Sequence, residues 1–288
     1  MRLVYLGTPV DAVPPLRALV GAGHEVALVV TQPDRRRSRG TGADPSPVKV
    51  AAMELGLPVR TPERAREVTE EVAGLGADLG VVVAFGQILR PALLAATRHG
   101  FVNVHFSLLP RWRGAAPVER AVLAGDAETG VWIMEVEEGL DTGGAYAVAR
   151  TPIGPEETAG ELRARLVALG TDLLVEHLPR VPHAVPSPQV GEPVYADKLR
   201  PEEFALDPDR SAAELVRVVR AGNPRPGAFT TVDGKRLKVL RAHAEPGATD
   251  RSGVLVTADG LLVFDEVQPE GKRPMAASAW LAGRRPAS

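Results

Sequence analysis

Residues 1–31 read MRLVYLGTPVDAVPPLRALVGAGHEVALVVT, and the order of their apolar and helical stretches decides the fold class. The apolar run at residues 2–6 ends at Gly7 and is typical of a strand buried on both faces of a sheet. A helical stretch follows toward Gly23, and a second apolar run occupies residues 25–31. A strand, a helix and a second strand in this order predict two parallel strands joined by a crossover helix.

The same alternation continues outward from this segment. Further strands are expected at residues 81–85, 100–105, 130–136 and 145–149. Ser46 and Pro47 have the composition of a helix start, and Gly56 can end that helix in the left-handed conformation. Residues 158–178 carry leucines at helical spacing, which predicts a long amphipathic helix. The expected fold class is therefore α/β, with a mostly parallel, Rossmann-like sheet and helices on both faces.

The chain changes character after residue 178. Five prolines fall between Pro179 and Pro193, which predicts an extended linker. A helical stretch at residues 212–221 follows, and turns such as Asp233-Gly234 and Asp259-Gly260 separate short strand-like runs at 228–232, 237–242, 254–257 and 261–267. This spacing predicts a small C-terminal β-barrel of the OB-like kind. We therefore divide the chain into a first domain at 1–178, a proline-rich linker at 179–204 and a β-barrel domain at 205–288.

The composition excludes several classes of protein. The 288 residues carry a net charge of −2, which does not fit a polybasic nucleic-acid binder, and the absence of cysteine excludes disulfide scaffolds, thiolate metal sites and cysteine nucleophiles. No apolar run of about 18 residues and no secretory signal are visible, so a cytoplasmic enzyme without a membrane segment is expected. Residues 205–288 hold 13 Lys and Arg against 10 Asp and Glu. This surplus either helps to hold RNA or is ordinary scatter.

Polar chemistry is densest around the strand at residues 100–105. Asn103 and His105 are two residues apart, so on a strand both side chains point to the same side, at the carboxyl edge where open α/β sheets bind ligands. Asp141 follows in the glycine-rich turn EGLDTGG. An amide, an imidazole and a carboxylate suit acyl transfer, because they can stabilise an oxyanion, move protons and orient the imidazole. Spacing alone leaves a structural alternative for each residue. Asn103 can cap a local turn, His105 can be a buried histidine with satisfied hydrogen bonds, and Asp141 can be a turn residue.

Nine short motifs together resemble the methionyl-tRNA formyltransferase family. They are LGTP at 6–9, TQPD at 31–34, PSPVK at 45–49, VVAFG at 82–86, NVHFSLLPRWRGAAP at 103–117, GDAETGV at 125–131, GLDTG at 139–143, YADK at 195–198 and NPRPGAF at 223–229. The likeness spans nearly the whole chain. The N-x-H and D-x-G elements mark the wider folate-dependent formyltransferase superfamily, whereas RGAAP, YADK and NPRPGA point to the tRNA branch.

The resemblance implies transfer of a formyl group from 10-formyltetrahydrofolate to the amino group of methionyl initiator tRNA, a step of translation initiation in protein biosynthesis. It assigns catalysis by direct amine attack to Asn103, His105 and Asp141, with Ser107 in support and without a metal. Initiator methionyl-tRNA and folate are the implied partners of a monomer. The folate would lie against Phe85, Gly86, Gln87, Ile88, Leu89, Ser107, Leu108, Leu109, Pro110, Glu138, Gly139 and Asp141.

The basic stretch RRRSRGTGAD occupies residues 35–44. The resemblance places Arg35, Arg36, Arg37 and Arg39 against the tRNA, together with Lys198. Arginine suits such a contact because its planar fork bonds two phosphate oxygens at once. The alternative is a solvated surface charge run.

Trp132 stands where the family usually has threonine, which bears on the acceptor. If the indole points into the site it narrows the acceptor space, and if it points into the helix layer it is only core. The alternative function is therefore a folate-dependent N-formyltransferase acting on a small amine, such as an amino sugar or an amino acid. A non-catalytic RNA- or folate-binding module is disfavoured, because Asn103, His105 and Asp141 occur together.

Overall fold

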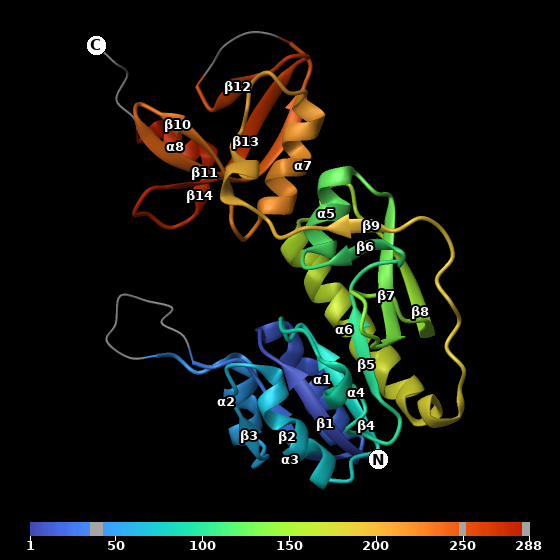
Figure 1. Cartoon of the computed structure of the whole chain (residues 1–288). Coiled ribbons are helices and arrows are strands. Elements are labelled where there is room, and N and C mark those ends of the chain that lie inside the picture. The colour runs from blue at the N-terminus through green and yellow to red at the C-terminus, as the bar shows by residue number, and fades with distance from the viewer. Residues whose placement is uncertain (35–42, 248–251, 284–288) are drawn as a thin grey trace. The chain divides into compact units, whose positions relative to one another are not determined.

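The computed structural model describes residues 1–34, 43–247 and 252–283. It divides into two compact units (Figure 1). The first unit comprises Met1–Ala115, Thr129–Thr151 and Arg163–Ala196, and the second comprises Ala116–Glu128, Pro152–Leu162 and Asp197–Ser288. The division at 1–178, 179–204 and 205–288 stays a prediction. No helix in the described ranges is long and apolar enough to cross a membrane.

The first unit is built on a seven-stranded sheet with the order β3-β2-β1-β4-β5-β7-β8. The strands β3, β2, β1, β4 and β5 run parallel, and β7 pairs antiparallel with β5. This confirms the predicted mostly parallel sheet. The bounds are Arg2–Gly7 for β1, Glu25–Val30 for β2, Val59–Arg60 for β3, Leu79–Val83 for β4, Phe101–His105 for β5, Glu128–Glu135 for β7 and Ala145–Pro152 for β8.

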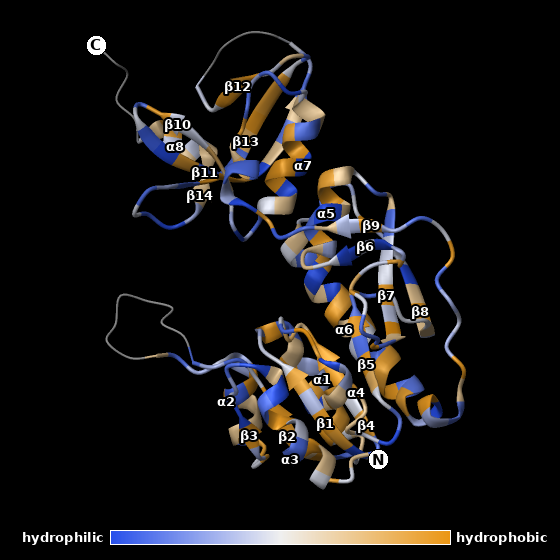
Figure 2. Ribbon diagram, viewed as in Figure 1, coloured by the Kyte–Doolittle hydropathy of each residue, from blue (hydrophilic) through white to orange (hydrophobic). Residues whose placement is uncertain are grey.

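Helices cover both faces of this sheet. Val4 and Leu6 of β1 point to one face, where they form a buried cluster with Val72 and Leu93 of two helices, α3 and α4. Tyr5 points the other way, and its hydroxyl donates to the Ala12 carbonyl before α1. The apolar colouring of β1 in Figure 2 follows this two-sided burial. The helical bounds are Val10–Ala12 for η1, Val13–Gly21 for α1, Pro47–Glu54 for α2, Ala65–Val68 for η2, Thr69–Gly74 for α3, Pro91–Leu94 for α4, Ala159–His177 for α6 and Leu178–His183 for η3.

The predicted helix start at Ser46 and Pro47 is confirmed. Ser46 Oγ accepts a hydrogen bond from the Lys49 backbone N–H at 3.0 Å, and it lies 2.7 Å from Thr31 Oγ1 at the end of the neighbouring strand. Gly56, just beyond the helix, has a φ of +68°, which is the left-handed conformation that the sequence predicted.

Ser46→Ala should destabilise the protein by about 1–2 kcal/mol, because it removes a helix cap and leaves the buried Thr31 hydroxyl with one bond fewer. Urea unfolding followed by circular dichroism measures this free energy. Ser46→Asn is the matched control, since it keeps a capping oxygen and should recover part of the loss. Equal stability of Ser46→Ala and the original chain would contradict the prediction.

The proline-rich segment after residue 178 is more than an extended linker. Val194–Ala196 forms β9, which pairs in parallel with β6 at Arg111–Gly114 in a two-stranded sheet. Ser187 exchanges two backbone hydrogen bonds of 2.8 Å with Ala145 at the start of β8. The predicted extended backbone is wrong at Leu178–His183, where the chain forms the 3-10 helix η3. The pairings were not predicted, because they depend on partners distant in the sequence.

The second unit carries a five-stranded antiparallel sheet, ordered β10-β11-β13-β12 with β14 also paired to β13. Asp233 and Gly234 have φ values of 50° and 72° and join β10 to β11, which suits the tight hairpin that their sequence predicts. In the described residues β10 does not pair with β12 or β14, so the sheet is open rather than a closed barrel. The strand bounds are Ala228–Val232 for β10, Lys235–Glu245 for β11, Val254–Val256 for β12, Leu261–Pro269 for β13 and Met275–Ala276 for β14.

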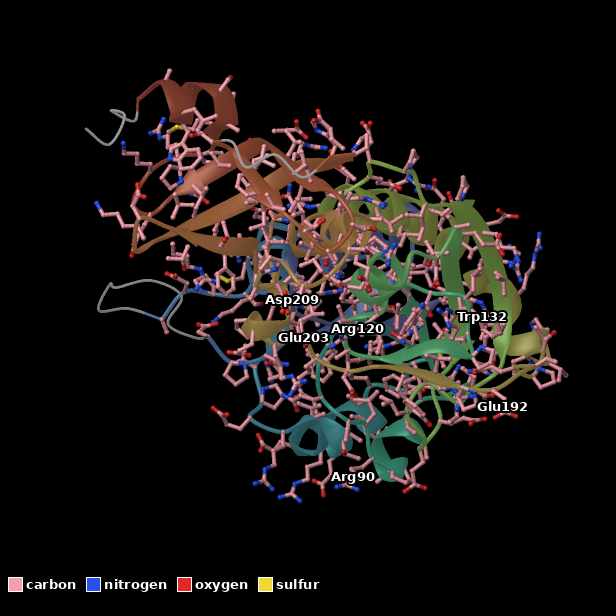
Figure 3. All side chains as sticks on the ribbon, turned by 90° about the horizontal axis from the view of Figure 1, so that it is seen from above. Arg90, Arg120, Trp132, Glu192, Glu203 and Asp209 are labelled. Carbon is pink, nitrogen blue, oxygen red and sulfur yellow. The ribbon has the colours of Figure 1, made fainter. Side chains whose placement is uncertain are left out.

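Polar side chains join and cap the helices of this unit. Arg120 of α5 forms an ion pair with Glu203 of η4 at 2.6 Å (Figure 3), and its guanidinium also donates to the Asp197 carbonyl. The N-terminus of α7 has a full capping box of Ser211 and Glu214. The helical bounds are Pro117–Ala124 for α5, Pro201–Phe204 for η4, Ala212–Gly222 for α7 and Ala277–Ala282 for α8.

Candidate active site

Asn103 and His105 lie on the same face of β5, as the sequence predicted. Val104 between them packs toward Gly170 of α6, so the two polar side chains point to the opposite face. His105 is only 5 % exposed, whereas Asn103 is half-buried. No hydrogen bond joins the Asn103 side-chain amide to another residue of the described ranges. The amide is therefore a donor available to a ligand at the end of β5.

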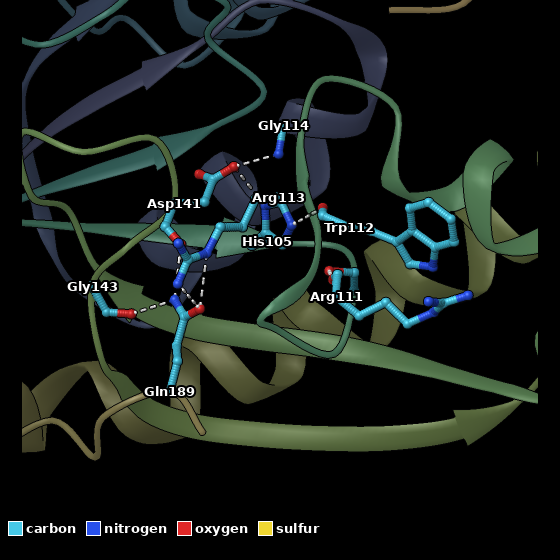
Figure 4. A network of polar contacts seen from close by, with 9 residues as sticks. His105, Arg111, Trp112, Arg113, Gly114, Asp141, Gly143 and Gln189 are labelled. Atoms are coloured by element: carbon cyan, nitrogen blue, oxygen red, sulfur yellow. Dashed lines mark hydrogen bonds and ion pairs between the residues drawn. The ribbon is translucent and has the colours of Figure 1, made fainter. Parts of the chain in front are cut away.

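The backbone of Trp112 fixes the tautomer of His105. His105 Nε2 lies 3.0 Å from the Trp112 carbonyl oxygen (Figure 4). A carbonyl can only accept, so Nε2 carries the hydrogen and Nδ1 of the neutral ring has a free lone pair. Nδ1 lies 3.7 Å from Asp141 Oδ2. The ring is thus oriented by one peptide group and presents its basic nitrogen to a carboxylate.

Asp141 is held by the backbone at the end of β6. The Gly114 N–H donates to Asp141 Oδ2 at 2.8 Å, which fixes the carboxylate beside the His105 ring. The side chain of Asp141 is 16 % exposed. Within the described part of the chain, Asp141 Oδ1 has no hydrogen-bond partner. One oxygen therefore positions the group, and the other is free to accept a proton.

Backbone strain gathers around these residues. Four described non-glycine residues have a left-handed φ, and two of them are Trp112 at 68° and Asp141 at 50°. A third, Ala84 at 46°, directly precedes the segment that begins at Phe85. Such conformations cost roughly 1–3 kcal/mol each and cluster at functional sites, where the surrounding structure enforces them.

The turn that carries Asp141 is closely packed against the chain itself. A Cβ on Gly143 would stand 2.0 Å from the Glu135 carbonyl oxygen, and a Cβ on Gly144 would stand 2.7 Å from the Ser187 carbonyl oxygen. Burial, with a smaller effect of the Glu137 carboxylate, raises the pKa of the Glu135 side chain. Gly143 and Gly144 therefore allow the neighbouring backbone to approach the turn closely.

The segment predicted to hold the pterin leaves the peptide groups of Gly86 and Ile88 without backbone partners in the described residues. Phe85 and Leu89 are buried in the core of the first unit, and the Gln87 side chain accepts from the Ala65 N–H. Gly86 has a φ of 77° and Ile88 is 74 % exposed. No backbone hydrogen bond joins Gly86 or Ile88 to another described residue. Free peptide edges of this kind fit a flat heteroaromatic ring that carries both donors and acceptors.

The other predicted folate and supporting residues lie in two loops, one directly after β5 and one directly before Asp141. Ser107 is fully buried, and its hydroxyl donates to the Arg111 carbonyl, so it braces the loop. Leu109 is buried, and Leu108 packs against the same cluster. Pro110 is half-buried, while Glu138 and Gly139 are exposed in the loop before Asp141.

Trp132 lies on the same sheet face as His105, because the two residues are directly paired across β5 and β7. The indole is 9 % exposed and packs against Leu109, Met134 and Ala145. Its Nε1 has no hydrogen-bond partner in the described ranges. The side chain therefore does not belong to the α6 layer, and it serves as core beneath the site face.

Sequence reasoning missed four contributors to this site. Trp112 and Gly114 act through backbone groups, and Arg113 and Gln189 form a side-chain pair beside Asp141 (Figure 4). Residues 111–114 belong to the motif at 103–117, but a sequence pattern cannot show which residue acts through its backbone carbonyl or N–H.

Of the five residues predicted to bind tRNA, only Lys198 lies within the described ranges. Arg35, Arg36, Arg37 and Arg39 lie outside the described residues, and Lys198 is exposed in the second unit. Just before the arginine segment, an ion pair of 2.6 Å joins Lys49 Nζ to Asp34 Oδ2. Among the described residues, no group of three or more His, Asp or Glu is arranged to hold a metal ion.

Comparison with known proteins identifies the family. Residues 1–178 match the model described as "Formyl transferase", and residues 198–285 match "Formyl transferase, C-terminal domain". A methionyl-tRNA formyltransferase of Ruegeria pomeroyi is 45 % identical, over 98 % of this chain and 97 % of that protein.

Two solved structures share the fold at 17 % identity and a TM-score of 0.69. The first is HypX from Aquifex aeolicus in complex with tetrahydrofolic acid. The match includes 98 % of this chain and 47 % of HypX. The second is an N-formyltransferase from Helicobacter canadensis in complex with folinic acid and dTDP-3-aminofucose. The match includes 93 % of this chain and 98 % of that protein. The chain belongs to the methionyl-tRNA formyltransferase family.

Proposed function

We propose that this chain transfers a formyl group from 10-formyltetrahydrofolate to the amino group of initiator methionyl-tRNA. The observation that carries the proposal is the convergence of Asn103, His105 and Asp141 at the end of β5, in a chain 45 % identical to a named methionyl-tRNA formyltransferase over nearly its whole length. The reaction serves translation initiation, and we expect a monomer that works in the cytoplasm.

The chemistry is acyl transfer by direct attack of an amine. When bound, 10-formyltetrahydrofolate supplies the formyl carbon, to which the amine of methionyl-tRNA forms a C–N bond while the bond to the folate nitrogen breaks. Asn103 donates its free amide N–H to the formyl oxygen, where negative charge grows as the amine attacks. Because this donor is already oriented on a strand, little reorganisation is needed at the moment of reaction.

His105 and Asp141 move the proton that the amine must lose. His105 Nδ1 faces Asp141 Oδ2 at 3.7 Å, and the Trp112 carbonyl accepts from the opposite nitrogen. Asp141 Oδ1 is the free acceptor, and Oδ2 stays bound to Gly114. A proton leaving the amine can be accepted by Asp141 or shared with His105 Nδ1, and can then pass to the folate nitrogen as it departs. Groups that transfer protons in this way typically contribute about 10²–10⁴-fold to the rate.

The folate donor lies, in this proposal, along Phe85 to Leu89 and near Glu138 to Asp141. The free peptide edges at Gly86 and Ile88 support this placement, because a pterin ring needs paired donors and acceptors. Ser107, Leu108, Leu109 and Pro110 support the ring indirectly, since Ser107 and Leu109 are buried beneath the loop.

A small amine as acceptor is the second candidate. The observation in its favour is that the fold is shared with an N-formyltransferase that was crystallised with an amino sugar nucleotide. That likeness is only 17 % identical and supports the fold alone. Trp132, the residue that raised this alternative, lies on the sheet face of His105 and not in the helix layer, but its indole is only 9 % exposed and packs against Leu109, Met134 and Ala145.

The acceptor is tested by a panel measured under one set of conditions. The protein and 10-formyltetrahydrofolate are incubated with charged initiator tRNA, with free methionine, or with an amino sugar nucleotide. The proposal expects formylation of the charged tRNA alone. Faster formylation of either small amine would favour the second candidate and reject the first.

The arginine segment gives a prediction specific to the tRNA acceptor. Neutralising Arg39, and then Arg35, Arg36 and Arg37, should raise the KM for charged tRNA and leave the KM for 10-formyltetrahydrofolate almost unchanged. Each lost phosphate contact should make the log–log salt dependence of tRNA binding shallower by roughly 0.7–0.9. Steady-state kinetics at several salt concentrations measure both effects. Unchanged tRNA kinetics after all four substitutions would make the segment a solvated charge run.

A further inference from the structure

Gln189 saturates all the hydrogen bonds that its side-chain amide can make. Its Nε2 donates to the Asp141 carbonyl and to the Gly143 carbonyl, both at 2.8 Å. Its Oε1 accepts from Arg113 Nε at 3.1 Å and from Arg113 Nη2 at 2.7 Å. An amide has two N–H donors and two acceptor lone pairs, so nothing is left over for solvent. A surface linker residue has no need of such a complete set.

Together with the hydrogen bond from Gly114, these bonds form a closed circuit that passes through Asp141 (Figure 4). Asp141 Oδ2 accepts from the N–H of Gly114, which directly follows Arg113 in the chain. Gln189 joins Arg113 back to the carbonyl of Asp141 itself. Asp141 and the end of β6 that holds its carboxylate are therefore tied to one side chain.

The position of Gln189 is set by the backbone around it. Ser187 forms an antiparallel bridge with Ala145, and Gly144 has no Cβ to keep the two segments apart. This bridge lies two residues before Gln189 and brings the side chain over the Asp141 turn. The next residue, Val190, is 86 % exposed, so the close packing stops after Gln189 and resumes only at β9.

The turn needs such a restraint, because Asp141 has a φ of 50°. Aspartate adopts the left-handed conformation more readily than most non-glycine residues, but the conformation is still less favourable than the ordinary one, so hydrogen bonds to the turn help to hold it. Two carbonyls on either side of Thr142 are held by the two N–H groups of a single amide. Relaxation of this turn would move the carboxylate away from His105 Nδ1.

We propose that Gln189 is a positioning residue for Asp141, so that the segment predicted as a plain linker is part of the catalytic apparatus. This inference rests on the proposed function, because it assigns Gln189 its effect through the Asp141 carboxylate. The donor groups of Gln189 are what matter, since they hold the turn. The acceptor oxygen secures Arg113 and thereby the end of β6, where Gly114 lies.

The test compares Gln189→Ala with the isosteric Gln189→Glu in the full chain. The carboxylate introduced by Gln189→Glu would keep the pairing with Arg113 but would lack both N–H donors, and it would place a negative charge beside Asp141. Both variants should lower kcat by about 10–100-fold, because a displacement of about 1 Å can cost about 10²-fold. The KM values for charged tRNA and for 10-formyltetrahydrofolate should change by less than about twofold, since the Gln189 amide is fully used by Asp141, Gly143 and Arg113 and has no donor or acceptor left for a substrate.

Two further measurements separate positioning from mere stability. Val190→Ala, a neighbouring substitution at an exposed position, should keep the original kcat, and melting curves report the folded fraction of every variant. Gln189→Ala combined with Asp141→Asn should be no slower than Asp141→Asn alone, because Gln189 acts through that carboxylate. A full multiplicative loss in the double variant would overturn the proposal, as would an original kcat in Gln189→Glu.

The outcome is distinguishable from failure of the proposed function. An unmutated chain that does not formylate charged tRNA rejects the function before any variant is compared. An active chain whose Gln189 variants lose activity only in proportion to their folded fraction rejects the positioning role and leaves the function intact.

Discussion

Asp141→Asn should lower kcat for formyl transfer by about 10²–10⁴-fold, the range typical of a group that moves a proton in the transition state. The substitution keeps the size of the side chain, but an amide cannot accept the proton that the amine loses. It also forces a choice at the Gly114 N–H, because only one of the two amide atoms can accept that hydrogen bond. Steady-state kinetics with charged tRNA measure the loss.

The control for this prediction is Asp172→Asn, an exposed carboxylate on α6 of the same unit. It should keep normal turnover. His105→Ala should fall in the same range as Asp141→Asn, and the double variant should be little slower than either, because groups that act as a unit are not additive. Near-normal turnover of Asp141→Asn, with an unchanged circular dichroism spectrum, would remove the carboxylate from the mechanism.

Gly143→Ala should lower kcat by about 10²-fold without touching a reacting group, because displacement of about 1 Å is enough for such a loss. The new Cβ would meet the Glu135 carbonyl oxygen at 2.0 Å, and a backbone atom of a paired strand cannot give way. The turn must therefore move, taking the Asp141 carboxylate and the carbonyl that Gln189 holds with it. Kinetics and thermal unfolding of the same preparation measure both consequences.

Gly21→Ala is the matched control, because a Cβ at the end of α1 would meet nothing within 4 Å. Alanine there should leave kcat unchanged and add stability of about 0.4–1 kcal/mol through the unfolded chain. An unchanged kcat in Gly143→Ala would mean that the turn tolerates the shift and that its position is less critical than we infer.

The elements that sequence reasoning located are those whose signals are local. The cap at Ser46, the leucine spacing of α6 and the Asp233-Gly234 hairpin depend on near neighbours in the chain, and the structure confirms all three. The juxtaposition of Asn103 and His105 was also predictable, because the two-residue period of a strand dictates it.

The missing parts of the site depend on contacts between distant segments. Gln189 lies 48 positions from Asp141, and a glutamine in a proline-rich stretch indicates only a polar residue of a linker. Trp112 contributes a carbonyl, which every residue has, so its side chain gives no signal. The orientation of Trp132 required the register of β5 against β7, which periodicity alone does not fix.

The central claim is that this chain formylates the amine of initiator methionyl-tRNA through the Asn103, His105 and Asp141 site. The most direct measurement incubates the protein with 10-formyltetrahydrofolate and charged initiator tRNA, strips the amino acid from the tRNA and identifies it by mass spectrometry, beside His105→Ala as a comparison. The account predicts N-formylmethionine in an amount equal to the tetrahydrofolate released, and a rate lower by about 10²–10⁴-fold in the variant. Unmodified methionine from the folded, unmutated protein, or equal rates in the two proteins, would contradict it.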